Sequence, residues 1–417
     1  METFEVIWGS SPEESTMGTT THGRVSDRVS NLRSPVVAQM LQRARALQDA
    51  GASLITLGRG EPDFDTPERI CRAAVRALQR GETHYPAIQG IPELRVAVAE
   101  KLARENGLCV DPATEVLITT GGTMGLYLAL MATVSPGDEV LLPDPIYDAY
   151  RGAIGLAGGR PVPVPSERAG DHFAVPVDTL RTHITSHSKA LLLNTPWNPT
   201  GSVVTKSELE SVGDLASEHN LFIIVDEVYE NIVFEGHTHV SLAALAEELK
   251  SRTITVNSFS KTYAMTGWRL GYNVASEDLV SAMTRVYQQS SRGPVTFVQW
   301  AGVEALRGPQ SGVQLMAQEY TRRRALLMEG LSDIAGVRTC VPEGTFFALV
   351  DIRDFGVSSL ELADHLLNEG HLITIPGEAY GSLGEGHIRL SFAVSQDAIL
   401  EGLARMSEAL KRLSRTP

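Results

Sequence analysis

Residues 253–271 read TITVNSFSKTYAMTGWRLG and join a short strand to a group of polar side chains. The run Thr253–Asn257 is typical of a strand in a sheet that is covered on both faces. Hydroxyl side chains, Lys261 and Arg269 follow it. Most lysines are solvated at the surface, and that interpretation stays open for Lys261. Hydroxyls and a guanidinium are, however, the donors that bind phosphate, and a lysine beside them can form a Schiff base.

Strands of the same kind alternate with helices on the N-terminal side of this stretch. The expected strands are Val116–Thr119, Glu139–Leu142, Ala190–Leu193 and Phe222–Val225, and the expected helices are Ile91–Glu105, Met124–Val134 and Lys206–Glu218. This alternation predicts an α/β fold, with a large domain in which a mostly parallel, mixed sheet lies between helices.

The regular alternation of strand and helix patterns ends at about Trp300, and the pattern of the C-terminal part predicts a smaller α+β domain. Its expected elements are helix Ala317–Leu331, strands Phe346–Val350 and His387–Phe392, and helix Gln396–Leu413. Another helical pattern starts near Ser34-Pro35. We therefore expect a flexible tail over 1–24, an N-terminal segment of the small domain over 25–66, a large domain over 67–292 and a small C-terminal domain over 293–417.

The composition is that of an ordinary globular protein. The 417 residues are 43% hydrophobic and 21% charged, with a net charge of −14, which argues against wholesale disorder and against a nucleic-acid partner. Three cysteines do not form a disulfide framework and are expected to be reduced thiols in a cytoplasmic protein. No apolar run approaches the ~18 residues that span a bilayer, so no membrane partner is expected.

Polar segments follow three further predicted strands, where ligands bind in open parallel sheets. The segment 120–123, TGGT, opens a helix and offers N–H groups and a hydroxyl to a phosphate, although such a segment is often only a turn. Asp226 is either a cap for a following helix or a buried carboxylate that holds a cationic ring nitrogen. The segment 194–201, NTPWNPTG, is either a simple turn or a device that fixes the Asn198 amide.

Two other features carry charge or metal-binding potential. Arg389 lies within the apolar run 388–392, IRLSF, and a buried charge is costly unless it is paired. Its carboxylate partner is expected from either the protein or a substrate. His237 and His239 could chelate a metal ion, but no third ligand is evident nearby, so we expect an exposed loop and no metal site.

Taken together, these motifs resemble the pyridoxal-phosphate-dependent aminotransferases of fold type I, class I/II, the group that includes aspartate aminotransferase. The resemblance extends from about residue 25 to residue 413. It is carried, in the family's order, by the segments 194–201, 226–229 (DEVY), 258–271 and 388–392. Weaker matches are the segments 57–64 (LGRGEPDF), 84–87 (HYPA) and 145–147 (PIY).

The resemblance implies a site for pyridoxal 5′-phosphate. Lys261 would form the internal aldimine, Asp226 would keep the ring nitrogen protonated, and Asn198 and Tyr229 would hydrogen-bond the ring oxygen. Tyr147 would stack on the ring. The residues implied to hold the phosphate are Gly122, Thr123, Ser258, Ser260 and Arg269, together with Tyr85 from the neighbouring subunit of a homodimer.

The implied reaction moves an α-amino group from an amino acid to a 2-oxo acid by a ping-pong mechanism through the Lys261 aldimine. The freed lysine would act as general base and then as general acid. Arg389 would bind the substrate α-carboxylate, with Gly60 and Asn198 in contact. Elimination, replacement or decarboxylative oxidation on the same fold stays open as an alternative. A ligand-sensing regulator is not expected, because the N-terminal segment is too short for a DNA-binding domain.

Two arginines bear on the choice of substrate. Arg59 and Arg292 are candidates to hold a distal carboxylate, and the alternative is that both are solvated or paired within the protein. On this basis we expect a preference for an acidic or polar amino acid.

Overall fold

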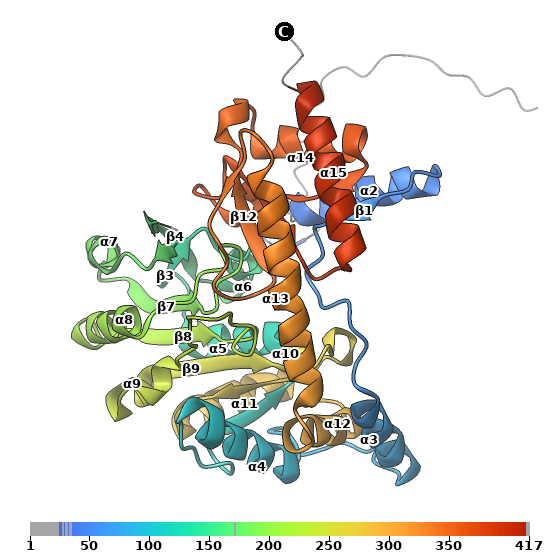
Figure 1. Cartoon of the computed structure of the whole chain (residues 1–417). Coiled ribbons are helices and arrows are strands. Elements are labelled where there is room, and N and C mark those ends of the chain that lie inside the picture. Colours follow the sequence, from blue (N-terminus) through green and yellow to red (C-terminus); the bar gives the residue numbers. More distant parts are fainter. Residues whose placement is uncertain (1–24, 27–28, 30–31, 33–35, 171, 414–417) are drawn as a thin grey trace, which may run out of the picture.

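The computed structural model describes residues 25–26, 29, 32, 36–170 and 172–413 (Figure 1). Its large sheet has the strand order β2-β10-β9-β8-β7-β3-β4, in which only β10 runs antiparallel to its neighbours. The strands are β2 Val116–Thr119, β3 Glu139–Asp144, β4 Arg160–Pro165, β7 Ser188–Asn194, β8 Phe222–Asp226, β9 Thr253–Ser258 and β10 Gly271–Val274. This confirms the predicted α/β class. The tail predicted for residues 1–24 lies outside the described residues.

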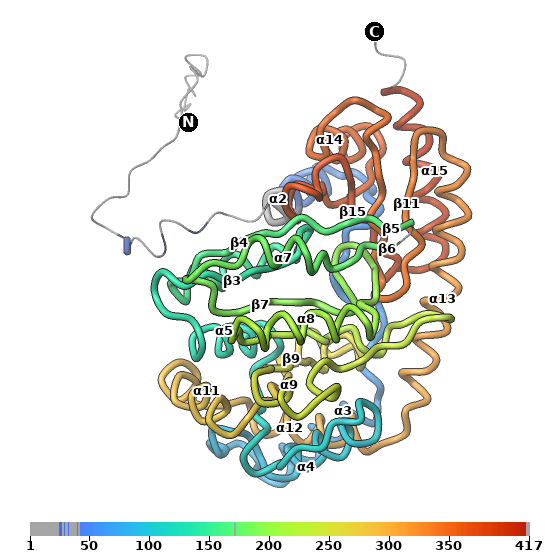
Figure 2. Tube along the Cα trace, turned by 90° about the vertical axis from the view of Figure 1, so that its left-hand side faces the viewer, coloured from blue at the N-terminus to red at the C-terminus, as the bar shows by residue number. Residues whose placement is uncertain are grey.

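The strands of this sheet are buried on both faces, which explains their continuous apolar sequences. In β7, Leu191 and Leu193 pack into one core, and Ala190 and Leu192 pack into the other. Helices α7, α8 and α9 cover the first face and look toward the viewer in Figure 2, whereas α5, α6 and α11 cover the second. Their bounds are α5 Gly122–Thr133, α6 Ala149–Leu156, α7 Val177–His183, α8 Lys206–Glu218, α9 Glu247–Arg252 and α11 Glu277–Ser290.

A second, four-stranded antiparallel sheet has the order β11-β12-β15-β14. Its strands are β11 Arg338–Thr339, β12 Phe347–Asp351, β14 Ile375–Pro376 and β15 His387–Ser391. Helices α13 Ser311–Ser332, α14 Ser359–Gly370 and α15 Gln396–Leu413 share its core. In Figure 1, α13 is a long helix that runs from α12 (Thr296–Arg307) toward this sheet.

The N-terminal segment packs with this second sheet although it is far away in the sequence. Met40 and Ala44 of α2 (Val36–Asp49) contact the core around Leu367 of α14. Strand β1 (Ile55–Thr56) pairs with β13 (Leu372–Ile373). This pairing places the segment that follows β1 between loops of the large sheet and loops of the second sheet.

A further core lies at the β2 edge of the large sheet. It contains α3 Glu68–Gln79, α4 Pro92–Lys101 and α12 Thr296–Arg307. A π-helix, Leu102–Asn106, follows α4, a hairpin joins β5 Glu167–Ala169 to β6 His172–Ala174, and α10 spans Phe259–Thr262. Because α12 packs with α3 and α4, it belongs with the large sheet although it follows residue 292. Among the described residues, no helix is long and apolar enough to cross a membrane.

Candidate active site

The parallel strands bring their polar C-terminal residues to one edge of the large sheet. The pairing of β7 with β8 places Asn194 directly beside Asp226, and Ser258 ends the next strand, β9. A cavity of about 700 Å³ opens at this edge. The predicted site residues that line it are Gly60, Gly122, Thr123, Tyr147, Asn198, Asp226, Tyr229, Ser258, Ser260, Lys261, Arg269 and Arg389. Tyr85 does not line it, and its side chain is 84% exposed.

Lys261 lies on the short helix α10, directly after β9. The Ser258 side chain caps this helix by accepting a hydrogen bond from the Ser260 N–H at 3.1 Å. The Lys261 Nζ donates to the Gly60 carbonyl at 2.6 Å. Burial, followed by the nearby positive charge of Arg389, lowers the pKa of Lys261 to about 8. A sizeable fraction of this amine is therefore neutral and nucleophilic near neutral pH.

An anion-binding cup lies beside the lysine. Helix α5 begins at Gly122 after Gly121, whose φ of +87° suits glycine, and a Cβ there would lie 2.7 Å from Arg269 Nη2. The Ser258 and Ser260 hydroxyls form a hydrogen-bonded pair in the same cavity. Among the described residues, the Arg269 guanidinium donates to the Thr266 carbonyl and forms no ion pair with a carboxylate. Free N–H groups, hydroxyls and an unneutralised arginine suit a phosphate.

Asp226 provides a buried carboxylate at the end of β8. It accepts hydrogen bonds from the Tyr150 hydroxyl at 2.8 Å and from the Val228 N–H at 3.2 Å. A turn, not a helix, follows it, so the helix-cap interpretation is wrong. Burial raises its pKa to about 6, and no described basic side chain forms an ion pair with it. A cation in the cavity would keep this carboxylate ionised.

Arg389 is a buried cation without a carboxylate partner among the described residues. Its Nη1 donates to the Asn198 side-chain oxygen at 3.1 Å and its Nη2 to the Gly58 carbonyl at 3.3 Å, while its Nε has no partner. The guanidinium stacks over the Phe347 ring at 4.0 Å. Of the two partners considered from the sequence, a carboxylate of the protein is thus not found, and the guanidinium is poised to bind one from a ligand.

Two predicted aromatic residues, Tyr147 and Tyr229, line the same cavity. Tyr147 makes an edge-to-face contact with Tyr150, the residue that holds Asp226, at 5.4 Å between ring centroids. Tyr229 is buried against Phe346 and Phe347, and burial raises the pKa of its hydroxyl well above the usual range. Both tyrosines therefore act as neutral, rigid walls of the cavity.

Several cavity residues were not anticipated from the sequence. Tyr150 lies three residues after Tyr147, at the start of α6, a spacing that could have indicated it. Glu61 accepts a hydrogen bond from the Thr266 hydroxyl at 2.8 Å. Phe347 and Tyr380 pack on Arg389. These contacts join segments that are separate in the sequence, so only the structure reveals them. Conversely, Arg292 does not line the cavity of the described chain, whereas Arg59 does.

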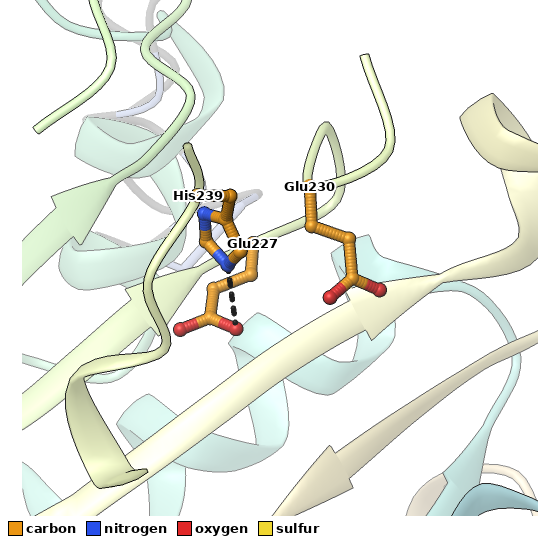
Figure 3. A group of neighbouring side chains, drawn as sticks. All are labelled: Glu227, Glu230 and His239. Carbon is orange, nitrogen blue, oxygen red and sulfur yellow. Dashed lines mark ion pairs between the residues drawn. The ribbon is translucent and has the colours of Figure 1, made fainter. Parts of the chain in front are cut away.

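A separate cluster of titratable side chains is formed by residues that follow β8 in the sequence. Ligand atoms of Glu227, Glu230 and His239 lie within 4.8 Å of one another (Figure 3). His239 Nε2 is 3.3 Å from Glu227 and its side chain is buried, so the prediction of an exposed loop is wrong for this histidine. Glu230 already pairs with the buried Lys101 and accepts from Asn257 at 2.7 Å. The positive charge of Lys101 would repel a metal ion bound here, and we therefore interpret the cluster as a structural network of ion pairs and hydrogen bonds.

The fold and the cavity together define a class of enzyme. A lysine of lowered pKa, an anion cup and a buried carboxylate meet at the carboxyl edge of a mixed sheet, which suits a phosphorylated carbonyl cofactor with a basic ring nitrogen. The sequence profile "Aminotransferase class I and II" matches residues 52–406. The chain belongs to this family, is an aminotransferase and uses pyridoxal 5′-phosphate.

Similar proteins cover almost the whole chain. It is 41% identical to aromatic-amino-acid aminotransferase 2 of Thermococcus litoralis and 40% identical to aspartate aminotransferase of Pyrococcus abyssi, each over 93% of this chain and 98% of the relative. The structure of Thermus thermophilus aspartate aminotransferase with maleate matches with a TM-score of 0.88 and 38% identity, over 92% of this chain and 99% of that one.

The residues present fit pyridoxal 5′-phosphate. The close approach of Gly121 to Arg269 leaves a cup without side-chain obstruction for the phosphate. Asp226 forms no ion pair with any described residue, and a protonated ring nitrogen would provide the missing cationic partner. Lys261 lies in the same cavity, with the lowered pKa that attachment to a carbonyl carbon requires.

The raised pKa of Asp226 makes a testable difference to stability in protein stripped of pyridoxal phosphate. A carboxyl whose pKa rises on folding, here from 3.8 to about 6, contributes stability that is full below pH 3.8 and is lost as the pH rises through about 6. Relative to Asp226→Asn, we expect the wild type to lose about 2.4 kcal/mol of unfolding free energy between pH 4 and pH 7.5. Urea unfolding of both proteins across this range measures the difference, and two parallel stability curves would contradict it.

Proposed function

We propose that the predicted site residues perform the aminotransferase reaction in the roles that their positions allow. Lys261 is the residue of covalent attachment for the cofactor, whose phosphate is bound by Gly122, Thr123, Ser258, Ser260 and Arg269. The single observation that carries this proposal is that a lysine of lowered pKa shares one cavity with Arg389, a buried arginine that pairs with no carboxylate in the part of the chain that the structure describes.

The substrate is oriented by its α-carboxylate. Arg389 binds this carboxylate in a bidentate fork, and Asn198 holds the guanidinium in place through the 3.1 Å hydrogen bond. The backbone of Gly60 borders the same space. Orientation matters because the proton on the α-carbon must face the Lys261 amine for transfer.

Proton transfer is the work of Lys261. When bound, pyridoxal phosphate withdraws electrons from the α-carbon and so acidifies its proton. The neutral Lys261 Nζ takes this proton as general base and returns it as general acid. Asp226, which accepts a hydrogen bond from Tyr150, would pair with the cationic ring nitrogen of the cofactor. Tyr229 and Asn198 would hydrogen-bond the ring oxygen, and Tyr147 would pack on the ring.

The reaction of the holoenzyme with an amino acid alone distinguishes transamination from elimination, replacement and decarboxylative oxidation. Addition of an amino acid to the holoenzyme is expected to convert the cofactor to its amine form, and addition of a 2-oxo acid is expected to restore it. Absorbance spectra follow both steps, and alternation of the two defines the ping-pong cycle. Release of ammonia and pyruvate without this conversion would indicate a lyase and contradict the proposed reaction.

We further propose that the enzyme is a homodimer. Tyr85 is 84% exposed, and Val295 is 47% exposed. The two are brought near each other because the Thr296 hydroxyl donates to the His84 carbonyl at 2.6 Å. An exposed tyrosine beside an exposed valine suits a contact between copies, in which Tyr85 reaches the phosphate of the partner. Sedimentation velocity tests this, and a monomer at micromolar concentration would contradict it.

Two further parts of the proposal concern the cellular location and the domain boundaries. We assign a cytoplasmic location, which the free thiols of Cys71 and Cys109 support. We also retain the division into a large and a small domain. The packing of α12 with α3 and α4 argues for a second boundary near residue 308 instead of 293.

A further inference from the structure

Arg59 occupies a distinctive place in the loop that borders the cavity. The carbonyl of the preceding residue, Gly58, accepts from Arg389 Nη2 at 3.3 Å, and the carbonyl of the following residue, Gly60, accepts from Lys261 Nζ at 2.6 Å. In the proposed function, on which this inference rests, these two partners bind the α-carboxylate and transfer the α-proton. The Arg59 side chain thus starts between the two groups that fix the substrate α-carbon, and it lines the cavity.

The present partner of Arg59 leaves its charge available. Its Nη2 lies 3.4 Å from Glu61 Oε1, and the two side chains are 42% and 46% exposed. Ion pairs of this kind contribute little, because both ions stay hydrated and mobile. Glu61 is also engaged elsewhere, since it accepts from the Thr266 hydroxyl at 2.8 Å. A ligand carboxylate can therefore join or replace Glu61 at the guanidinium at low cost.

The other cationic groups of the cavity already have assigned ligands. Arg269 faces the cofactor phosphate, Arg389 faces the α-carboxylate, and Lys261 serves proton transfer. Among the described residues that line the cavity, Arg59 is the cationic side chain that remains for a further anionic group. We propose that Arg59 binds the distal carboxylate of the substrate, and that this enzyme prefers dicarboxylic amino acids and dicarboxylic 2-oxo acids.

One cavity residue argues for the opposite preference. Asp148 lines the same cavity and would favour a cationic side chain. Burial raises the pKa of Asp148, and the positive charge of Arg389 is the largest opposing cause. Burial thus favours the neutral form of Asp148, whereas the Arg59 side chain is 42% exposed and keeps its charge. The balance favours an anionic substrate side chain over a cationic one.

The test compares donors that differ only in the charge of the distal group: aspartate with asparagine, and glutamate with glutamine. In Arg59→Gln holoenzyme, the ratio of kcat/KM for the acid to kcat/KM for the amide is expected to fall by about 10- to 100-fold, mainly through KM. Arg59→Lys should restore part of the ratio because it keeps the charge but loses the fork. Arg181→Gln is the matched control, since Arg181 is an exposed arginine paired with Glu218 outside the cavity, and its ratio should stay at the wild-type value.

A second measurement does not depend on turnover. Binding of the unreactive dicarboxylate succinate to the holoenzyme, compared with butyrate, should weaken selectively in Arg59→Gln. Equal losses for acid and amide donors, a wild-type preference for lysine or ornithine, or a change of ratio only in Arg292→Gln would each overturn the proposal. Failure of the proposed function looks different, because wild-type holoenzyme would then convert its cofactor with none of the donors.

Discussion

Lys261→Ala is expected to abolish transamination. Loss of the general base alone costs about 10²- to 10⁴-fold in rate, and the variant also loses the covalent attachment of the cofactor. The side chain lies inside the cavity and contacts the Gly60 carbonyl at 2.6 Å, and no other lysine lines this cavity in the described part of the chain. Single-turnover absorbance changes with an amino donor measure the rate, and borohydride reduction measures the covalent link.

The matched control for this variant is Lys206→Ala. Lys206 is a lysine on the surface of α8, 66% exposed and 3.5 Å from Glu210, so its loss should leave rate and cofactor attachment at the wild-type level. Retention of a reducible link to the protein in Lys261→Ala would assign the attachment to another lysine. A variant that still turns over within tenfold of the wild type would remove Lys261 from proton transfer.

Arg389→Leu should produce the second largest loss, by about 10²- to 10³-fold in kcat/KM for amino acids. Truncation of one partner of a buried charge pair typically costs 2–5 kcal/mol, roughly this range. The effect should depend on the α-carboxylate, because Arg389 has no carboxylate partner among the described residues and is fixed by Asn198 and Gly58. Steady-state kinetics with a set of amino donors measure it.

A donor without an α-carboxylate provides the internal control. Simple primary amines that react slowly with the holoenzyme should show little difference between wild type and Arg389→Leu, since they offer the guanidinium nothing to bind. Equal losses for amines and amino acids would show that the substitution disturbs the cavity as a whole. Unchanged melting temperature of the variant would exclude that explanation independently.

Much of the large sheet could be predicted from the sequence because its strands are buried on both faces. Continuous apolar runs such as Val116–Thr119 coincide with observed strands, and Lys206–Glu218 coincides with α8. Strand β10 was missed because its sequence, GYNV, contains glycine and asparagine, and its antiparallel pairing with β2 and β9 depends on neighbours far away in the chain. Helix α12 shows the same limit, since only its contacts reveal that it packs with the large sheet.

The candidate site was visible in the sequence as polar residues that follow apolar strands, and parallel pairing brings such residues to one edge. The sequence by itself thus predicted the fold class, which the structure confirms, and it proposed the reactive lysine, the buried acid and the phosphate donors. Only the tertiary structure decided that Arg389 has no carboxylate partner among the described residues, that Tyr150 supports Asp226 and that Arg59, not Arg292, lines the cavity of its own chain. The physical reason is that charge compensation and burial depend on distances between segments, and those distances are set by the packing of the two sheets and not by local sequence.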